Sequence, residues 1–414
     1  MTKAPGGAKS RAVSASEINA RAAAIKPSAT LAISAKAGAL KSEGKDVLSF
    51  SAGEPDFRPP AHVVEAVRSK LADLAVGYAP VPGLPALRDA VAEELSAYHG
   101  YGFGRNNILV SNGAKHSLAN FFLVALHPGE EVIFPSPFWV SYPEMIAFAG
   151  GVPKIVTTTA ETRLKLTPEL LEGAITDKTK VLLLNSPGNP TGVGYTADEV
   201  RALGEVLARK APQAYLLCDD IYRKLTYGDY QHASAFKALE GITDRIVIVD
   251  GLSKSHAMTG FRIGFLAAPV HIIDACNAVQ GQTTSGAATP SQWGAVAAMN
   301  EDACKDELAE MMAAFTRRRT LMIEGLRAIP DVSLIEPDGA FYCFADFGKY
   351  VGSREDIRDD LDFAGYLLDE KLVAAVPGSA FGSPGYLRLS FATSDENIQK
   401  GLERIAEACG ALRG

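Results

Sequence analysis

The sequence predicts an α/β protein: a large domain with a mainly parallel seven-stranded sheet, plus a smaller α+β domain. Short apolar runs alternate with amphipathic stretches from about residue 105 to residue 270. After about residue 300 the pattern changes to a long charged stretch followed by further apolar runs. A chain of 414 residues is also long for one small domain. These three observations favour two packed units of unequal size.

Seven apolar runs are the candidate strands of the large sheet. Amphipathic stretches such as Lys115–Leu126 and Ala197–Arg209 separate some of them. This alternation is typical of parallel strands with helices on both faces and right-handed crossovers. The runs are Ile108–Val110, Val132–Phe134, Lys154–Val156, Val181–Leu184, Tyr215–Leu217, Ile246–Val249 and Ile263–Ala267.

The C-terminal part predicts the smaller unit. A helix is expected over Glu301 to Ala328, and the pieces VSLI, AFYCFADF, VAAVP and YLRLSFA resemble strands. We therefore expect a large domain over 61–300 and a small domain over 301–414, and we expect the N-terminal segment 17–60 to be part of the small domain. Residues 1–16 are basic, rich in Ser and Ala, and free of acids. They predict a disordered tail, with an organelle transit peptide as the alternative.

Composition excludes several classes of protein. Hydrophobic residues make up 47% and charged residues 21%, as in a globular protein with a sizeable core. A formal charge of −7 argues against nucleic-acid binding and against a polybasic membrane surface. No apolar run approaches the length of a membrane span. Five cysteines without a C-x-x-C pair indicate a reducing compartment, taken as the cytoplasm, and no metal site.

Polar residues follow four of the candidate strands. The segments are SNGAK (111–115), NSPGNPTG (185–192), DDIY (219–222) and GLSK (251–254). Ligands bind at the carboxyl ends of the strands in sheets of this kind. We therefore expect these four segments to form one site.

Each segment suggests a chemical role. A glycine at a strand-to-helix turn, Gly113, predicts an anion site made of backbone N–H groups, with an ordinary N-cap by Ser111 or Asn112 as the alternative. Arg262 and Ser253 would complete a phosphate site.

The remaining segments supply acid, hydroxyl, amide and amine groups. A carboxylate at a buried strand end, Asp219, would pair with a protonated ring nitrogen or cap the next helix. Tyr222 and Asn189 would donate to a phenolate oxygen. A partly desolvated lysine near cations, Lys254, can form a Schiff base, whereas most lysines are solvated surface groups.

These groups together describe a pyridoxal-phosphate site, and the sequence resembles the class I/II pyridoxal-phosphate-dependent aminotransferases. It is most similar to the bacterial-type aspartate/prephenate aminotransferase subgroup, and the resemblance implies a fold-type I enzyme. Matching blocks run in family order over nearly the whole chain. They are KPSAT (26–30), AGEPDF (52–57), YAPVPGLPALR (78–88), NGAKHSL (112–118), SPFWVSYPEM (136–145), NSPGNPTG (185–192), DDIYRKLTY (219–227), GLSKSHAMTGFRIG (251–264), PDGAFYCF (337–344) and VAAVPGSAFGSPGYLRLSFA (373–392).

The resemblance implies a role for each matching residue. Lys254 forms the Schiff base with pyridoxal 5'-phosphate, Asp219 keeps the ring nitrogen protonated, and Arg388 binds the substrate α-carboxylate. Gly251 departs from relatives that carry a serine there, so Ser253 or backbone groups take over that contact. The cofactor set is Tyr78, Gly113, Ala114, Trp139, Asn189, Asp219, Tyr222, Ser253, Lys254 and Arg262, with Tyr78 reaching the phosphate of a neighbouring subunit. The substrate set is Thr30, Gly53, Lys115, Trp139, Asn189 and Arg388.

The same resemblance implies the substrate. Thr30 and Lys115 match positions that the subgroup uses for acidic side chains, and Lys26 matches a position associated with prephenate; Lys115 as a helix-surface lysine is the alternative. We expect a cytoplasmic homodimer that transfers the amino group of L-aspartate to 2-oxoglutarate by ping-pong kinetics, with prephenate or aromatic acids as further substrates. Alternatives are an alanine or aromatic aminotransferase, a C–S or β-lyase of the same fold, and a non-enzymatic binding module.

Overall fold

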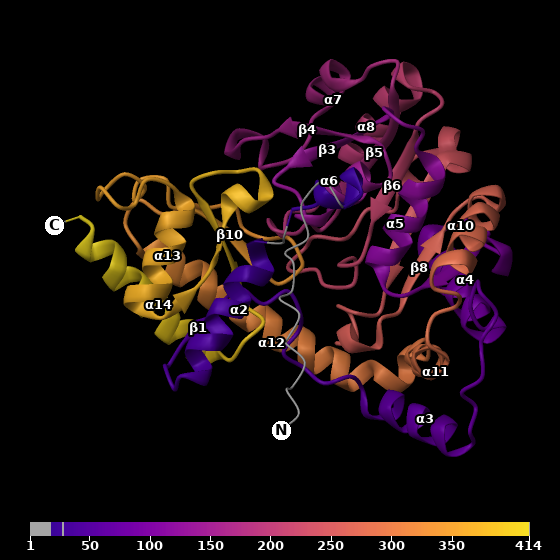
Figure 1. The fold of residues 1–414 in the computed structure, drawn as a ribbon, viewed down its shortest axis with the longest axis horizontal. Coiled ribbons are helices and arrows are strands. Elements are labelled where there is room, and N and C mark those ends of the chain that lie inside the picture. Colours follow the sequence, from indigo (N-terminus) through magenta and orange to yellow (C-terminus); the bar gives the residue numbers. More distant parts are fainter. Residues whose placement is uncertain (1–17, 27–28, 414) are drawn as a thin grey trace, which may run out of the picture.

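The computed structural model describes residues 18–26 and 29–413. The tail predicted at 1–16 lies outside them. The large sheet has seven strands in the order β2-β8-β7-β6-β5-β3-β4, and β8 alone runs antiparallel to its neighbours. The predicted sheet is confirmed (Figure 1). Its strands are β2 (Ile108–Ser111), β3 (Glu131–Ser136), β4 (Val152–Thr157), β5 (Thr179–Asn185), β6 (Tyr215–Asp219), β7 (Ile246–Gly251) and β8 (Gly264–Ala267).

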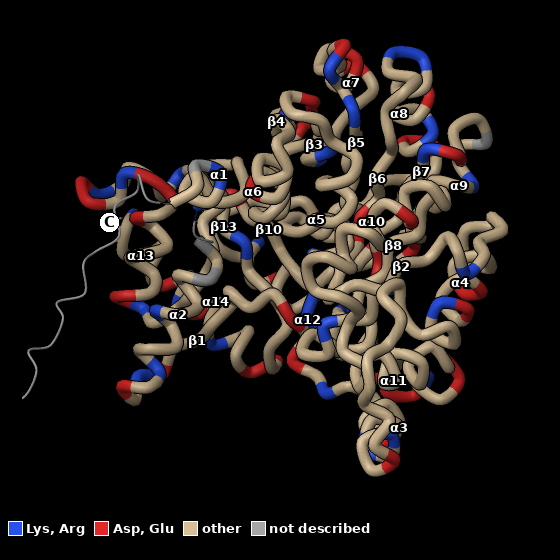
Figure 2. Tube along the Cα trace, turned by 45° about the vertical axis from the view of Figure 1, so that its right-hand side comes forward, with Lys and Arg blue, Asp and Glu red and all other residues tan. Residues whose placement is uncertain are grey.

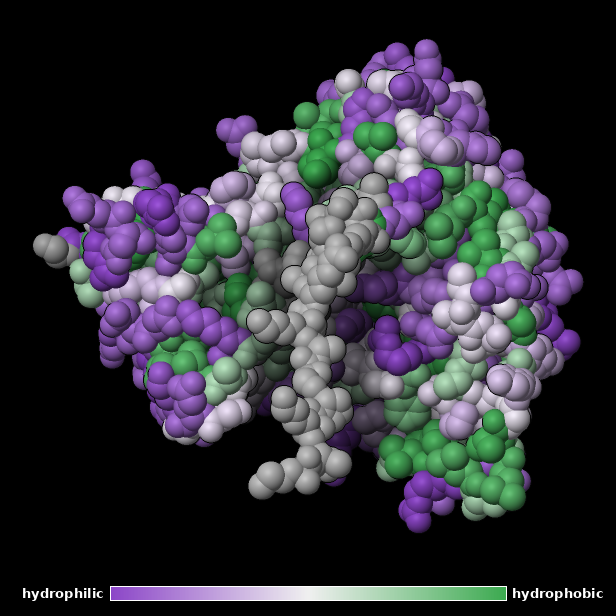
Figure 3. Space-filling model, viewed as in Figure 1, coloured by the Kyte–Doolittle hydropathy of each residue, from purple (hydrophilic) through white to green (hydrophobic). Residues whose placement is uncertain are grey.

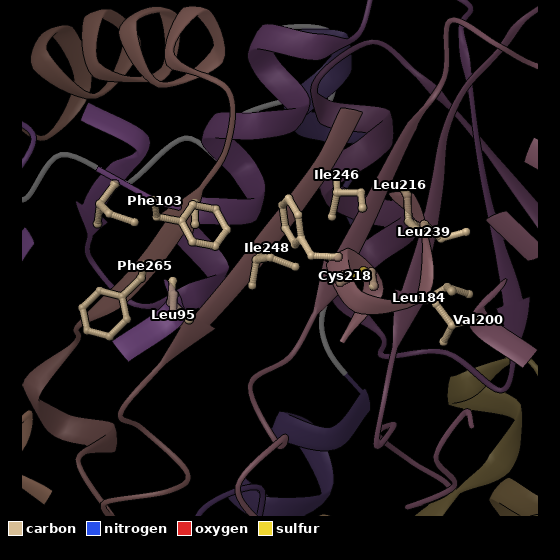
Figure 4. Close-up of a cluster of buried hydrophobic side chains, with 14 of the residues drawn as sticks. Leu95, Phe103, Leu184, Val200, Leu216, Cys218, Leu239, Ile246, Ile248 and Phe265 are labelled. Atoms are coloured by element: carbon tan, nitrogen blue, oxygen red, sulfur yellow. The ribbon is translucent and has the colours of Figure 1, made fainter. Parts of the chain in front are cut away.

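Helices cover both faces of this sheet. Alternate residues of β7 enter different cores: Ile246 and Ile248 pack in one, Val247 and Val249 in the other. Figure 4 shows part of the first core, where β5, β6 and β7 contribute residues beside Leu95 and Val200. Burial on both faces explains why these strands are continuous apolar runs. The helices of the large unit are α3 (Ala61–Ala72), α4 (Pro85–His99), α5 (Ala114–Ala125), α6 (Ser141–Phe148), α7 (Pro168–Ala174), α8 (Ala197–Lys210), α9 (Ala235–Ala238), α10 (Val270–Thr283) and α11 (Thr289–Ala298).

A smaller unit follows the long helix α12 (Glu301–Ala328). Its antiparallel sheet has the order β12-β13-β10-β9 and packs with α12, α13 (Asp360–Lys371) and α14 (Asp395–Ala411) around a separate core. The strands are β9 (Ser333–Leu334), β10 (Tyr342–Asp346), β12 (Val376–Pro377) and β13 (Tyr386–Ser390). The predicted helix 301–328 and all four predicted strand-like pieces are present, VAAVP being divided between β11 (Val373–Ala374) and β12.

The N-terminal segment crosses between the two units. After α1 (Ala20–Ala23) and α2 (Ala29–Ser42), strand β1 (Leu48–Ser49) pairs in parallel with β11 of the C-terminal part. Helix α3 then packs against α11 of the large unit. Residues 29–49 therefore lie on the smaller unit (Figure 1). The domain boundaries stay a prediction.

Positions of Lys and Arg are interspersed with positions of Asp and Glu along the chain (Figure 2). Over residues 18–26 and 29–413, no helix is long and apolar enough to cross a membrane. All five cysteines are buried and free.

One apolar surface patch stands out at the corner formed by α3 and the segment after it (Figure 3). We call it the α3 patch. Its exposed residues are Val64, Leu71, Leu74, Val76 and Tyr78, and the Tyr78 side chain is completely exposed. Apolar patches of this kind often mark contact surfaces.

Candidate active site

A cavity of about 690 Å³ lies at the carboxyl ends of the large-sheet strands, where the smaller unit faces them. Most of the predicted site residues line it, which confirms that the four strand ends converge. They are Thr30, Gly53, Ala114, Lys115, Trp139, Asn189, Asp219, Tyr222, Ser253, Lys254, Arg262 and Arg388. Gly113 lies next to it at the start of α5. Tyr78 belongs to the α3 patch and lies outside the cavity wall.

The start of α5 forms one end of the cavity. Gly113 is its N-cap residue with φ +86°, and no side chain among the described residues caps this end. The alternative of an ordinary cap is wrong, because Ser111 Oγ donates instead to Gln280 Oε1 at 2.8 Å. A Cβ on Gly113 would come within 2.4 Å of the Arg262 guanidinium, so Gly113 lets that cation approach the helix start. Free N–H groups beside a guanidinium make an anion site.

Asp219 ends β6 deep in the cavity wall. It pairs in register with Asn185 of β5, whose Nδ2 donates to the Asp219 carbonyl at 2.8 Å. The Asp219 carboxylate accepts a hydrogen bond of 2.6 Å from Tyr142 Oη, and both side chains are buried. Burial raises the pKa of Asp219 to about 7, although the Tyr142 bond acts in the opposite direction. A nearby cation would therefore strongly favour the ionised form.

We expect Asp219→Asn to stabilise the ligand-free protein more at high pH. The folded-state pKa of about 7 lies above the ordinary aspartate pKa of 3.8, so the unfolded state loses its proton first as pH rises. Folding then opposes ionisation, and wild-type stability falls relative to the variant between these two values. Between pH 5 and pH 8 the difference in unfolding free energy should grow by roughly 3 kcal/mol. Urea titrations at both pH values measure it, and the exposed Asp229→Asn is the control. A constant difference would contradict the burial argument.

Tyr142 was not predicted as a site residue. It lies on α6, three residues after Trp139, and the two rings meet edge to face with centroids 5.3 Å apart. The block SPFWVSYPEM contains both residues. The sequence does not indicate, however, that the Tyr142 side chain points toward the end of β6. Tyr142 thus fixes the positions of Trp139 and Asp219 together.

Two tyrosines form another part of the cavity wall. The hydroxyl groups of Tyr222 and Tyr342 are 3.0 Å apart and buried, and both residues line the cavity. Tyr342 also was not predicted; it comes from β10 of the smaller unit. Asn189 lies nearby, and its Oδ1 accepts from Arg388 Nη1 at 3.0 Å.

Lys254 projects from the loop after β7. Its Nζ donates to the Gly53 carbonyl at 2.5 Å. The pKa of Lys254 is lowered to about 8, mainly by burial of the ammonium. The positive charges of Arg262 and Arg388 act in the same direction, and the negative charges of Glu54 and Asp219 oppose them. A lysine of this kind reaches its neutral, nucleophilic form near physiological pH.

Arg388 is the most unusual charge in the cavity. It projects from β13, is 2% exposed, and forms no ion pair within the described residues. Its Nη groups donate only to neutral acceptors, Asn189 Oδ1 and the Ser51 carbonyl at 2.8 Å, and Nε has no partner in the same part of the chain. The guanidinium carbon lies 4.5 Å from the Tyr342 ring centroid. A buried cation without an anion is costly, so this position favours an anionic ligand.

Lys115 provides a further cation. It lies in the first turn of α5, and its Nζ is 4.8 Å from the Trp139 ring centroid. Partial burial, and secondarily the charge of Arg262, lower the pKa of Lys115. Thr30 faces the same cavity from α2. The cavity thus contains two separate positions for negative groups besides the helix start.

A backbone segment that we call the strap, residues 51–56, ties these groups together. The Ser51 carbonyl accepts from Arg388, and the Gly53 carbonyl accepts from Lys254. The Glu54 carboxylate accepts from Thr259 Oγ1 at 2.7 Å, and Asp56 pairs with Arg318 of α12 at 2.8 Å. The strap therefore connects the smaller unit to the loop that carries Lys254.

Comparison with known proteins agrees with this geometry. Residues 45–405 match the family model described as aminotransferase class I and II. An aspartate aminotransferase of Bacillus subtilis is 42% identical over 93% of this chain and 97% of its own. An aspartate/prephenate aminotransferase of Nitrosomonas europaea is 39% identical over 94% of this chain and 99% of its own.

Solved structures give the same result. The aspartate aminotransferase of Thermus thermophilus with maleate superposes with a TM-score of 0.89 at 40% identity, covering 94% of this chain and 99% of the other. The aspartate aminotransferase of Rhizobium meliloti gives a TM-score of 0.90 at 40% identity, covering 95% and 98%. With most of its length matched by the family model and by these relatives, the chain belongs to the class I and II aminotransferases, enzymes that depend on pyridoxal phosphate.

Proposed function

We propose that this aminotransferase moves the amino group of L-aspartate to 2-oxoglutarate with pyridoxal 5'-phosphate. The observation that carries the proposal is the placement of two cations, Arg388 and Lys115, in the cavity that holds Lys254; neither forms an ion pair within the described residues. An acid with carboxylates at both ends offers one anion to each cation. The names of the relatives, which refer to aspartate, support this choice. So does the maleate in the Thermus thermophilus structure, since maleate is a four-carbon dicarboxylate.

The cavity residues fit the cofactor group by group. The uncapped start of α5, with Arg262 and Ser253, suits a phosphate. The buried carboxylate of Asp219 suits a protonated pyridine nitrogen. The hydroxyl of Tyr222 and the amide of Asn189 would donate to the ring oxygen, Trp139 would stack on the ring, and Gly113 and Ala114 would contact the phosphate through their backbone.

When bound, pyridoxal phosphate supplies an aldehyde that reacts with amines and a ring that withdraws electrons. Asp219 would hold the ring nitrogen charged, and Tyr142 would keep that carboxylate ionised and aimed into the cavity. Arg388 would bind the substrate α-carboxylate as a bidentate fork, which orients the α-carbon. The carbonyl of Gly53 would line the same end.

Lys254 would be both the cofactor-bearing amine and the proton carrier. With a pKa near 8, a fraction of its Nζ is neutral at physiological pH and can remove the proton from the substrate α-carbon. The hydrogen bond to the Gly53 carbonyl holds Nζ beside the strap. Each turnover then consists of two half-reactions in one cavity, the first releasing oxaloacetate and the second producing glutamate.

The test is the ultraviolet–visible spectrum of the purified holoenzyme with L-aspartate and no keto acid. The long-wavelength absorbance of the bound cofactor should disappear, and one equivalent of oxaloacetate should be released per site. An absorbance that responds only to alanine or to phenylalanine would overturn the choice of substrate. Release of pyruvate and ammonia without a keto-acid acceptor would indicate a lyase.

We expect Lys115→Ala to weaken dicarboxylic substrates selectively. The kcat/KM for aspartate should fall about ten-fold or more, because one charge-assisted contact is lost. Alanine has no side-chain carboxylate, so its kcat/KM should change much less. The exposed Lys349→Ala is the matched control. Equal losses for both amino acids would show instead that Lys115 acts on the cofactor phosphate.

A homodimer with shared sites is part of the proposal. The α3 patch is apolar and ends in Tyr78, a completely exposed tyrosine outside its own cavity. A second copy seated on this patch would bury it and could bring Tyr78 to the other cofactor phosphate. A cytoplasmic location is also proposed, since five free thiols are typical of a reducing compartment.

Prephenate is a further proposed substrate. The relative from Nitrosomonas europaea carries prephenate in its name. Lys26, the matching position in this chain, is exposed, and its backbone N–H donates to Glu144 Oε2 at 3.0 Å. Its side chain forms no ion pair within the described residues and would be available to a ring carboxylate.

A further inference from the structure

Tyr342 is a buried residue of the smaller unit that reaches the active-site cavity. It begins β10 and is 0% exposed, yet it lines the cavity together with Lys254. Its hydroxyl lies 3.0 Å from the hydroxyl of Tyr222, which follows β6 of the large sheet. The two rings meet edge to face with centroids 5.9 Å apart. This contact joins the smaller unit to a group that the proposed function places at the cofactor.

Backbone hydrogen bonds hold the two tyrosines in this arrangement. The loop after β6 pairs with the segment before β10: the Ala340 N–H donates to the Leu225 carbonyl, and the Tyr227 N–H donates to the Asp338 carbonyl, both at 2.9 Å. Tyr227 Oη also donates to the Ala340 carbonyl at 2.5 Å. The distance between the two hydroxyl groups is therefore set by paired backbone segments.

The bond between these hydroxyl groups leaves one proton for the cavity. Each hydroxyl carries one proton, and the bond uses one of the two. Neither oxygen has another hydrogen-bond partner within residues 18–26 and 29–413. The hydroxyl that accepts therefore keeps a proton for a ligand in the cavity, since a buried proton without an acceptor is unfavourable. The direction of the bond decides which tyrosine donates to that ligand.

Neighbouring charges favour donation from Tyr342 to Tyr222. The Arg388 guanidinium carbon lies 4.5 Å from the Tyr342 ring centroid, because the two residues are diagonal neighbours on one face of the β10–β13 pair. Burial raises the pKa of both hydroxyl groups, and the positive charge of Arg388 opposes this rise. At Tyr222, the neighbouring Tyr342 hydroxyl and the negative charge of Asp219 raise the pKa further. Tyr342 is thus the more acidic hydroxyl and the better donor, and Tyr222 keeps the proton for the cavity.

Asn189, the other proposed donor to the cofactor ring oxygen, is oriented in a similar way. Arg388 Nη1 donates to Asn189 Oδ1 at 3.0 Å. A guanidinium can only donate, so the amide presents its oxygen to Arg388 and its Nδ2 group remains for a ligand. Both proposed donors to the ring oxygen thus accept a hydrogen bond from a residue of the smaller unit.

We propose that Tyr342 is a positioning residue that donates to Tyr222 and so directs the Tyr222 proton to the ring oxygen of the cofactor. The inference rests on the proposed function, which places that oxygen at Tyr222 and Asn189. Tyr342 acts through Tyr222 and not by contact with the cofactor. A hydroxyl that accepts a hydrogen bond becomes a stronger donor, so two hydroxyl groups in series stabilise negative charge on the ring oxygen.

The test is a pH titration of the visible absorbance of the holoenzyme without substrate. A hydrogen bond to the ring oxygen favours the form in which that oxygen carries more negative charge, which is the form present at higher pH. Tyr342→Phe keeps the ring and removes only the hydroxyl, so the midpoint of the titration should rise by roughly 0.5–1 pH unit. Tyr222→Phe should raise it at least as much. In the double variant, Tyr342→Phe should add less than about 0.2 pH unit to the shift caused by Tyr222→Phe, since the two hydroxyl groups act in series.

Tyr350→Phe is the matched control. It also removes one hydroxyl from a buried tyrosine of the smaller unit, but that hydroxyl donates to the Pro330 carbonyl at 2.6 Å and lies outside the cavity. Its midpoint should equal that of the wild type. Urea unfolding of the cofactor-free protein provides a second measurement. The effects of Tyr222→Phe and Tyr342→Phe on the unfolding free energy should not add, because either substitution breaks the same hydrogen bond.

The inference is overturned if Tyr342→Phe leaves the midpoint unchanged while Tyr222→Phe raises it, or if the two shifts add. A lower midpoint in Tyr342→Phe would also overturn it, because Tyr222 would then be the donor to Tyr342 and the substitution would release its proton. If neither variant shifts the midpoint, the ring oxygen does not lie at Tyr222, and the cofactor placement in the proposed function fails as well. The aspartate specificity is tested separately by the wild-type spectrum with L-aspartate.

Discussion

Lys254→Ala should abolish transamination, with turnover at least about 10⁴-fold below that of the wild type. The reason is geometric as well as chemical. Lys254 is the lysine that faces Asp219 and Arg388 in the cavity, and its Nζ has a pKa of about 8, so it alone combines nucleophile and proton carrier there. Lys115 also lines the cavity, but it lies against Trp139 at the start of α5. Both half-reactions should therefore fail together.

Rapid-quench assays with L-aspartate and with 2-oxoglutarate measure each half-reaction of this variant. The groups of the α5 start and Arg262 remain, so the variant should still retain pyridoxal phosphate without a covalent bond, as equilibrium dialysis would show. Lys349→Ala, at an exposed position, should behave as the wild type. Turnover of Lys254→Ala near the wild-type rate would remove Lys254 from the mechanism.

Arg388→Lys should lower kcat/KM for every amino acid substrate by a factor on the order of 10²–10³. A lysine cannot reproduce a fork that bonds Asn189 and the Ser51 carbonyl while leaving a face for a carboxylate. Every α-amino acid carries that carboxylate, so the loss should be the same for aspartate, alanine and phenylalanine. Steady-state kinetics with the three amino acids measures it.

Arg201→Lys, in an exposed helix, is the control for this substitution, since its side chain is 47% exposed and remote from the cavity. A loss confined to aspartate would mean that Arg388 reads the substrate side chain and that another group binds the α-carboxylate. The hydrogen bond from Arg388 to the Ser51 carbonyl of the strap would then need a different interpretation.

The sequence alone predicts the large sheet because its central strands are buried on both faces. Such strands are continuous apolar runs, and Ile246–Val249 was visible for that reason. The strand ends were equally visible, since Asp219 and Lys254 are ionisable groups that follow those runs within a few residues. The start of α5 was predicted one residue late, at Lys115 in place of Ala114.

The residues that were missed are those whose role depends on distant packing. Tyr142 reaches Asp219 across 77 positions of sequence, and Tyr342 reaches Tyr222 across 120. The sequence pattern around each tyrosine does not reveal which distant residue it contacts. With β6 or the loop after it placed differently, Tyr142 and Tyr342 would be ordinary core residues.

The distribution of site residues between the two units has an evolutionary consequence. Lys254 follows β7 and Asp219 ends β6 of the large sheet, whereas Thr30, Gly53 and Arg388 belong to α2, the strap and β13. Substitutions on α2 can change which acid is accepted without disturbing the groups that make and break bonds. Directed evolution of new preferences should therefore accumulate changes in α2 and the strap before it alters any strand end.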